Sequence, residues 1–105
     1  MKFKNMFSPI QIGPMTVKNR FVVPPMGNNF ANSDGTWSDE SVAYYGERAK
    51  GQFGLITIEA TVVHKGAKGG PKKPCLYDDN SIESLKKITD ACHEEGAKVS
   101  IQLQN

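Results

Sequence analysis

Two patterns of apolar residues alternate along this chain: short continuous runs, and apolar positions spaced three or four residues apart. Residues 20–24, 55–63 and 97–103 are short apolar runs rich in β-branched residues, which predicts three strands. The near-continuous run at 55–63 is typical of a strand buried on both faces. Residues 38–51 and 81–95 place apolar side chains every three or four positions, which predicts two amphipathic helices. Strands that alternate with helices in this way predict parallel pairing with right-handed crossovers.

Both predicted helices have end signals. Ser38 is a good N-cap, and Asp39 and Glu40 follow it in the first turn, where the helix dipole favours negative charge. Gly51 is expected to supply a left-handed C-cap to the first helix, and Gly96 is expected to end the second. Each helix therefore leads directly into the strand that follows it.

Residues 8–18 predict a small β-hairpin, because Ile10 and Ile12 alternate with polar positions and Gly13-Pro14 supplies a turn. The three predicted strands would leave one sheet face and an edge uncovered. A barrel of eight βα units needs about 250 residues. We therefore interpret residues 1–105 as the N-terminal part of an α/β TIM (β/α)8 barrel, with a hairpin cap, three strands and two helices, and with the remainder of the barrel absent.

Composition and charge exclude several classes of protein. The chain is 38% hydrophobic and 23% charged, which is ordinary for a globular protein and argues against disorder. The net charge is +2, and the basic residues are spread out except at residues 65–73, so no nucleic-acid partner is expected. That cluster is interpreted as a solvated loop rather than a phosphate site. No apolar run approaches the roughly 18 residues that span a bilayer, so no membrane partner and a cytoplasmic location are expected.

Several single residues are interpreted as structural. Cys92 lies on the apolar side of the second helix, Cys75 lies in a loop, and their spacing matches no metal motif, so neither a metal site nor a disulfide is expected. Glu59 is a carboxylate in an apolar strand and needs a partner, for which Arg20 is the candidate. His64 and His93 are expected at the surface, and Trp37 is expected either in the core or against the hairpin.

Candidate chemistry lies where the predicted strands end, because α/β barrels build their active sites there. Gly27 and Ala60 permit the close approach of a flat ligand, and the amide of Gln102 can donate and accept hydrogen bonds. These strand ends hold few acid–base groups, and no catalytic residue is assigned. Such a site suits an enzyme whose cofactor performs the reaction.

Several short motifs, separated from one another, are spread over the whole chain. They are MFSPIQIG at 6–13, VKNRFVVPPM at 17–26, Asp34-Gly35, Tyr44-Tyr45, Arg48-Ala49-Lys50-Gly51, Gly54-Leu55-Ile56, Glu59-Ala60 and Gln102-Leu103. Together they resemble the start of the old yellow enzyme family, FMN-dependent ene-reductases built on a TIM barrel. The sequence is most similar to the NADH-dependent flavin oxidoreductase branch, which includes 2-enoate, 2,4-dienoyl-CoA and bile-acid-modifying reductases.

The resemblance implies FMN as cofactor and NAD(P)H as reductant, with an activated C=C bond of an unsaturated carbonyl substrate (an enoate, enone or dienoyl-CoA) as the acceptor. It implies that Pro25, Met26 and Gly27 pack against the isoalloxazine ring, that Ala60 lies near the flavin, and that Gln102 hydrogen-bonds its pyrimidine ring. Residues 1–105 would then belong to a flavin-binding barrel domain and would be inactive alone.

The chain departs from the family pattern at Gly27, where some relatives carry a cysteine that tunes or binds the flavin. The branch also holds an iron–sulfur cluster through later cysteines; the cluster, and an FAD if there is one, would lie beyond residue 105. A homo-oligomer is left open. Two alternatives also stay open: a non-catalytic fragment or interaction module, and a barrel enzyme that binds a phosphorylated metabolite without flavin.

Overall fold

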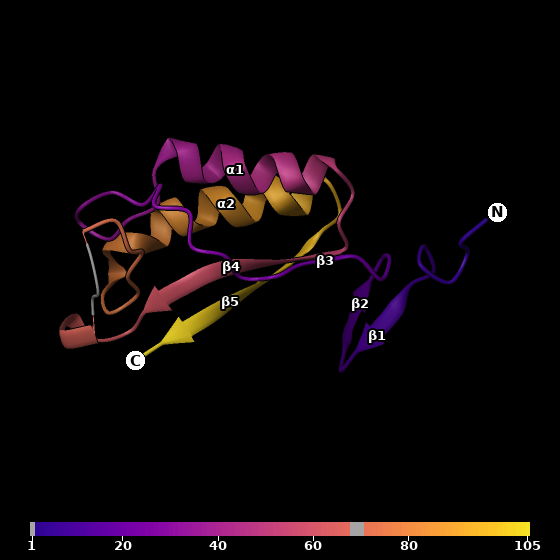
Figure 1. The fold of residues 1–105 in the computed structure, drawn as a ribbon, viewed down its shortest axis with the longest axis horizontal. Helices are drawn as coiled ribbons and strands as arrows, with labels where there is room; N and C mark the ends of the chain where they lie inside the picture. Colours follow the sequence, from indigo (N-terminus) through magenta and orange to yellow (C-terminus); the bar gives the residue numbers. More distant parts are fainter. Residues whose placement is uncertain (1, 68–70) are drawn as a thin grey trace.

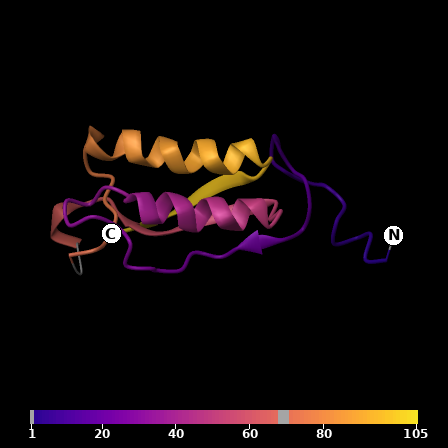
Figure 2. The same cartoon turned by 90° about the horizontal axis from the view of Figure 1, so that it is seen from above.

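The computed structural model describes residues 2–67 and 71–105. Its centre is a three-stranded parallel sheet in the order β3-β4-β5, formed by Val22–Val23, Leu55–Val62 and Lys98–Gln104. Helix α1 (Asp39–Lys50) connects β3 to β4, and α2 (Ile82–Glu94) connects β4 to β5. Both helices cover the same face of the sheet (Figures 1 and 2). The predicted β-α-β-α-β order with parallel pairing is therefore confirmed.

The predicted hairpin is also present. Strands β1 (Ile10–Ile12) and β2 (Met15–Val17) pair antiparallel, and Gly13 adopts a left-handed φ of 56° in the turn between them. The hairpin lies beside the end of the sheet at which the parallel strands begin (Figure 1). A hydrogen bond links the segment after the hairpin to the end of α2: Lys18 Nζ donates to the carbonyl of Glu95 at 2.6 Å.

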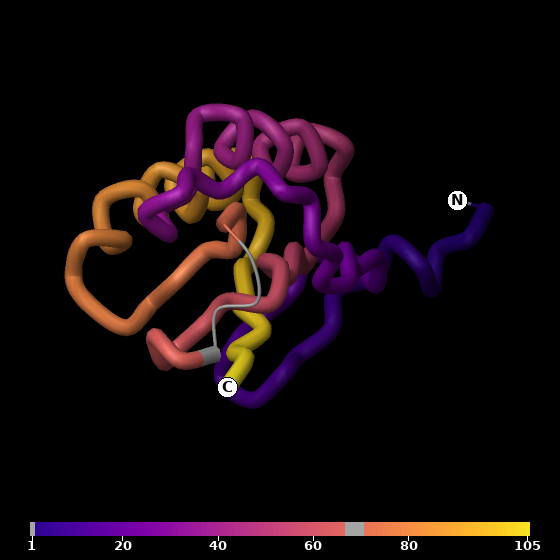
Figure 3. The backbone as a smooth tube through the Cα atoms, turned by 60° about the vertical axis from the view of Figure 1, so that its left-hand side comes forward, coloured from indigo at the N-terminus to yellow at the C-terminus, as the bar shows by residue number. Residues whose placement is uncertain are grey.

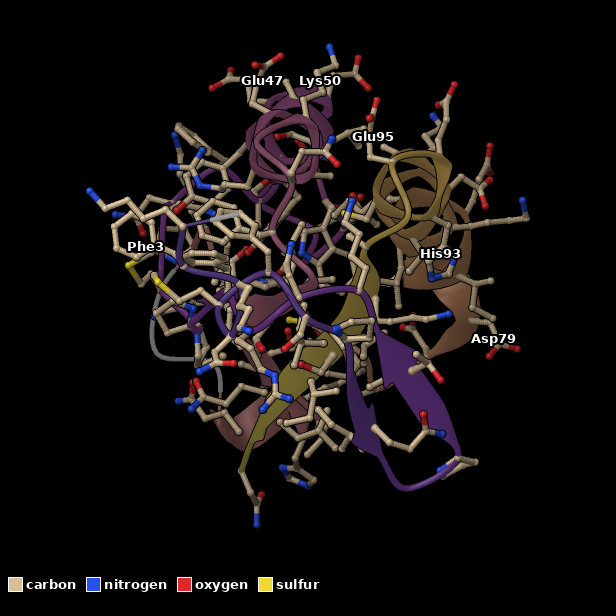
Figure 4. The ribbon with its side chains drawn as sticks, turned by 90° about the vertical axis from the view of Figure 1, so that its right-hand side faces the viewer. Phe3, Glu47, Lys50, Asp79, His93 and Glu95 are labelled. Atoms are coloured by element: carbon tan, nitrogen blue, oxygen red, sulfur yellow. The ribbon has the colours of Figure 1, made fainter. Side chains whose placement is uncertain are left out.

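The core lies between the sheet and the two helices. Most of its buried side chains come from β4, α1 and α2, and they pack into one cluster that includes Ile56, Ile58, Tyr45, Ile88 and Cys92. The helices themselves approach closely, since an added Cβ at Gly46 would lie 3.8 Å from the Cβ of Ala91. Figure 4 shows Glu47 and Lys50, an exposed ion pair at 3.3 Å, on the far side of α1 from the sheet.

The helix ends agree with the sequence except at one position. The Ser38 hydroxyl accepts a hydrogen bond from the Ser41 amide, which confirms the predicted N-cap. Gly96, with a φ of 81°, ends α2 as expected. The expected left-handed cap at Gly51 is wrong: Gly51 keeps a φ of −71°, and Gln52 adopts the left-handed conformation at 73°. The Gln52 carbonyl accepts a hydrogen bond from the Asn19 amide, which holds it in place.

The first strand is shorter than the five residues predicted. Only Val22 and Val23 pair with β4, opposite Leu55 and Ile56. Pro24 and Pro25 follow directly and have no N–H to donate, so the ladder stops there. The described sheet does not close, because β3 and β5 are both edges. None of the described helices has the length and apolar character needed to cross a membrane.

Candidate functional site

The three segments predicted to carry chemistry lie at the end of the sheet where the parallel strands finish. We call this end the C-terminal edge, as distinct from the edge strands β3 and β5. Because the strands are parallel and adjacent, the loop after β3, the end of β4 and the end of β5 all project from the same side. Figures 1 and 3 show the chain leaving β4 close to the C-terminal end of β5. The segments that carry Gly27, Ala60 and Gln102 therefore lie at the same end of the sheet.

A β-bulge shapes this edge. Ile58 pairs with Ile101, but the next pair is Thr61 with Leu103, so Glu59 and Ala60 together stand opposite Gln102. The burial along β4 changes at the same place: Ile58 and Glu59 are both buried, whereas Ala60 is only partly buried. The bulge thus places a carboxylate in the interior and a small residue at the accessible edge.

The three segments could hold a flat, partly polar group. A Cβ added at Gly27 would find only Lys73 Nζ within 4 Å, at 3.9 Å, so the space over this glycine is otherwise open. Met26 is 48% exposed beside it and offers a flexible apolar side chain. Within residues 2–67 and 71–105, no hydrogen bond engages the side-chain amide of Gln102, which is therefore available to a ligand that both donates and accepts.

Glu59 lies directly behind this edge and is 2% exposed. The Tyr45 hydroxyl of α1 donates to Glu59 Oε1 at 3.0 Å and accepts from the Glu59 amide at 3.0 Å. Burial, with the Glu59 carboxylate adding to it, raises the pKa of Tyr45 far above its ordinary value. Tyr45 therefore remains a hydrogen-bond donor at any physiological pH.

The expected partner of Glu59 was wrong. The Arg20 guanidinium instead donates to the carbonyls of Ser8 at 3.4 Å and Pro9 at 3.2 Å, near the hairpin. Sequence reasoning missed Tyr45 as the partner. The available signal was the helical spacing of Val42, Tyr45 and Ala49, which places the phenol on the buried side of α1.

The remaining candidate residues contribute little to this edge. His64 and His93 are exposed as predicted, and the described residues contain no group of three potential metal ligands. Both cysteines are free, and Cys92 is fully buried as expected. Cys75 is also buried, and it forms an isolated bridge with Val62, the last residue of β4.

The basic loop at residues 65–73 and the aromatic residue Trp37 are the last two features that the sequence singled out. Lys65 begins a short 3-10 helix, η1 (Lys65–Ala67), and its ammonium lies 5.7 Å from the centre of the Tyr77 ring. A second one, η2 (Asp79–Ser81), precedes α2. Part of the predicted solvated loop at 65–73 lies outside the described residues. Trp37 is buried in the core, which is the first of its two expected positions.

Parallel βαβαβ units of this kind are the building blocks of α/β barrels, whose sites lie at the strand ends. The model of the NADH:flavin oxidoreductase / NADH oxidase family matches residues 5–105, and the chain belongs to this family. The resemblance to old yellow enzymes is therefore confirmed.

Solved structures of old yellow enzymes agree with this assignment. The old yellow enzyme from Pichia sp. AKU4542 is 36% identical with a TM-score of 0.89, over 96% of this chain and 26% of that one. The old yellow enzyme from Trypanosoma cruzi is 35% identical with a TM-score of 0.88, over 98% of this chain and 27% of that one. A 2-naphthoyl-CoA reductase in complex with 2-naphthoyl-CoA is 34% identical with a TM-score of 0.91, over 95% of this chain and 15% of that one. The chain thus corresponds to the N-terminal portion of a TIM barrel and spans about a quarter or less of each of these relatives.

Proposed function

We propose that the protein to which this chain belongs is an FMN-dependent oxidoreductase that reduces an activated C=C bond at the expense of NAD(P)H. When bound, FMN would supply the hydride chemistry, accepting hydride from the nicotinamide and delivering it to an enoate, enone or dienoyl-CoA. The observation that carries the proposal is the meeting of Gly27, Ala60 and Gln102 at one strand edge. Membership of the flavin oxidoreductase family supports it independently.

The residues of this chain would bind and orient the flavin. Pro24 and Pro25 restrict the backbone after β3, so that Met26 and Gly27 are presented in a fixed direction. Gly27 leaves its space open, and Ala60 in the bulge adds only a methyl group, so both admit the face or edge of a ring system. Gln102 would pair with the polar, pyrimidine side of the isoalloxazine.

The test of this proposal is a substitution in the complete protein. Gln102→Leu is expected to weaken FMN binding by about tenfold, because a polar atom of the flavin would lose its partner on binding. Gln11→Leu, on the exposed hairpin, is the matched control and should leave the affinity unchanged. The dissociation constant is measured by the quenching of FMN fluorescence as apoprotein is added. A complete protein that purifies without colour and takes up no FMN would refute the proposed function.

A further inference from the structure

Three elements meet at the buried carboxylate of Glu59. Besides the two contacts with Tyr45 of α1, the Asn28 backbone amide donates to Glu59 Oε2 at 3.4 Å. The Asn28 side-chain amide donates to the Tyr45 hydroxyl at 3.5 Å. The phenol oxygen therefore donates one hydrogen bond and accepts two, which uses its full capacity. Helix α1, the bulge of β4 and the loop after β3 are tied to one another by this small network.

This hydrogen-bond network links the chain after β3 to β4 at a point where the two strands no longer pair. Pairing of β3 with β4 ends at Val23 and Ile56, well before the bulge. Among the residues that the structure describes, the Asn28–Glu59 contact is the one hydrogen bond that joins residues 24–29 to β4. Glu59, oriented by the phenol of Tyr45, therefore links the loop after β3 to the end of β4.

The position of the network in the sequence relates it to the candidate site. Asn28 follows Gly27, and Glu59 precedes Ala60, so each anchor is the chain neighbour of a proposed flavin contact. A buried carboxylate without a cationic partner is costly, and neither ion pair of the described residues involves Glu59. Such an arrangement is unfavourable for stability alone, but it does lock the geometry of the two segments that flank it, as residues that support a binding site do.

We propose that Tyr45 and Glu59 are positioning residues that hold the Gly27 and Ala60 segments at the separation required by the flavin. The inference rests on the proposed function, because the binding site whose geometry these residues would fix is that of FMN. Neither residue touches the cofactor; Glu59 acts through Asn28 and through its own backbone, and Tyr45 acts by fixing the Glu59 carboxylate. A purely structural role would alter the stability of the protein and leave the flavin environment unchanged.

The experiment compares two neighbouring tyrosines in the complete flavoprotein. Tyr45→Phe removes the hydroxyl and leaves the Glu59 amide and carboxylate without this partner. Tyr44→Phe is the matched control, because Tyr44 lies on the same helix and interacts through its ring, with the Arg48 guanidinium 3.5 Å from its centre. Three properties are measured for each variant: the FMN dissociation constant, the visible absorption maximum and midpoint potential of the bound flavin, and the thermal unfolding of the apoprotein.

Tyr45→Phe is expected to weaken FMN binding by about tenfold and to shift the flavin spectrum and potential, because binding would then have to order two segments that are no longer held at the required spacing. Tyr44→Phe should match the wild type in all three properties. Glu59→Gln provides a second variant of the same size. Its amide group must face an N–H or the already saturated Tyr45 oxygen, so it is expected to disturb the flavin in the same way. If Tyr45→Phe does not fold, Glu59→Gln decides.

Normal FMN affinity, spectrum and potential in the folded Tyr45→Phe and Glu59→Gln variants would overturn the inference, even if both unfold at lower temperature. That result leaves the proposed function intact, because the wild type still binds FMN. Failure of the wild-type protein to bind FMN would instead refute the proposed function, and the positioning role with it. The two failures are therefore distinguishable in a single set of titrations.

Discussion

Gly54 is packed so closely that even a methyl group cannot be added without displacing its neighbours. It lies just before β4, and its N–H donates to the carbonyl of Phe21 at 3.1 Å. A Cβ on Gly54 would lie 2.6 Å from Asn19 Oδ1, 2.7 Å from Val17 Cγ1 and 2.9 Å from the Asn19 carbonyl oxygen. Both neighbours are buried, and the Asn19 side chain is held by the Gln52 carbonyl at 2.7 Å and the Phe21 amide at 3.1 Å.

Gly54→Ala is therefore expected to lower the free energy of unfolding by about 1–3.5 kcal/mol. Overpacking by one methyl group costs about 1–3 kcal/mol, and loosening an Asn19 hydrogen bond costs about 1 kcal/mol. The reduced entropy of the unfolded chain offsets about 0.4–1 kcal/mol of this loss. The same substitution at Gly46 is the control, because its nearest neighbour would be the Ala91 Cβ at an ordinary 3.8 Å. In the interior of α1, Gly46→Ala should stabilise by about 0.5–1 kcal/mol.

The assay is thermal unfolding of the two variants and the wild type as apoproteins, so that flavin binding does not contribute to the measured stability. The unfolded-state effect of Gly→Ala is common to both variants and cancels in their difference. The remaining difference in the free energy of unfolding between the two variants then reports mainly the close packing where the hairpin, β3 and β4 meet. A Gly54→Ala protein at least as stable as Gly46→Ala would refute the reasoning, because it would show that Val17 and Asn19 can move aside without cost.

Two further predictions concern Cys92 and the isolated segment. Burial raises the pKa of the Cys92 thiol from an ordinary 9.0 to about 11, so the unfolded chain loses this proton first, and the free energy of unfolding should fall as pH rises through that range. Cys92→Val should lack this portion of the decline, and parallel pH profiles for the two proteins in denaturant titrations would contradict the assignment. The isolated 105-residue chain is expected to show no NAD(P)H-dependent enone reduction, because it corresponds to only 26% of the Pichia structure; turnover in a spectrophotometric assay would show this to be wrong.

The parts of the fold that the sequence could predict are those set by local patterns. Ser38 caps α1 through its own side chain, and Ile56 and Ile58 of β4 are buried because both helices cover their face of the sheet. Burial of β4 on both faces, which the apolar run predicted, is not complete in the described residues, because Leu55 and Thr57 are only partly buried. The errors arise where a distant residue decides the local structure. The left-handed residue after α1 is Gln52 rather than Gly51, because the Asn19 amide binds its carbonyl from 33 positions away.

Cys75 lies in the loop between β4 and η2, as expected, but the sequence did not indicate that it is buried. Its burial depends on a bridge to Val62 and on the close approach of Gly35, where an added Cβ would lie 2.8 Å from the Cys75 Cβ. No periodicity in residues 71–80 signals these contacts. Such long-range contacts are fixed only when the strands are placed side by side.

The candidate site shows the same division between local and distant causes. Glycine and alanine at strand ends, and a glutamine in an apolar strand, are visible in the sequence, so Gly27, Ala60 and Gln102 could be predicted as neighbours once parallel pairing was assumed. The bulge could not, because an apolar run such as residues 55–63 is equally compatible with a regular strand. A regular strand would alternate Glu59 to the face opposite Ile58, whereas the extra residue lets both be buried. One inserted residue therefore both exposes Ala60 at the edge and places the Glu59 carboxylate against Tyr45, so the accessible contact and the buried network behind it share a single cause.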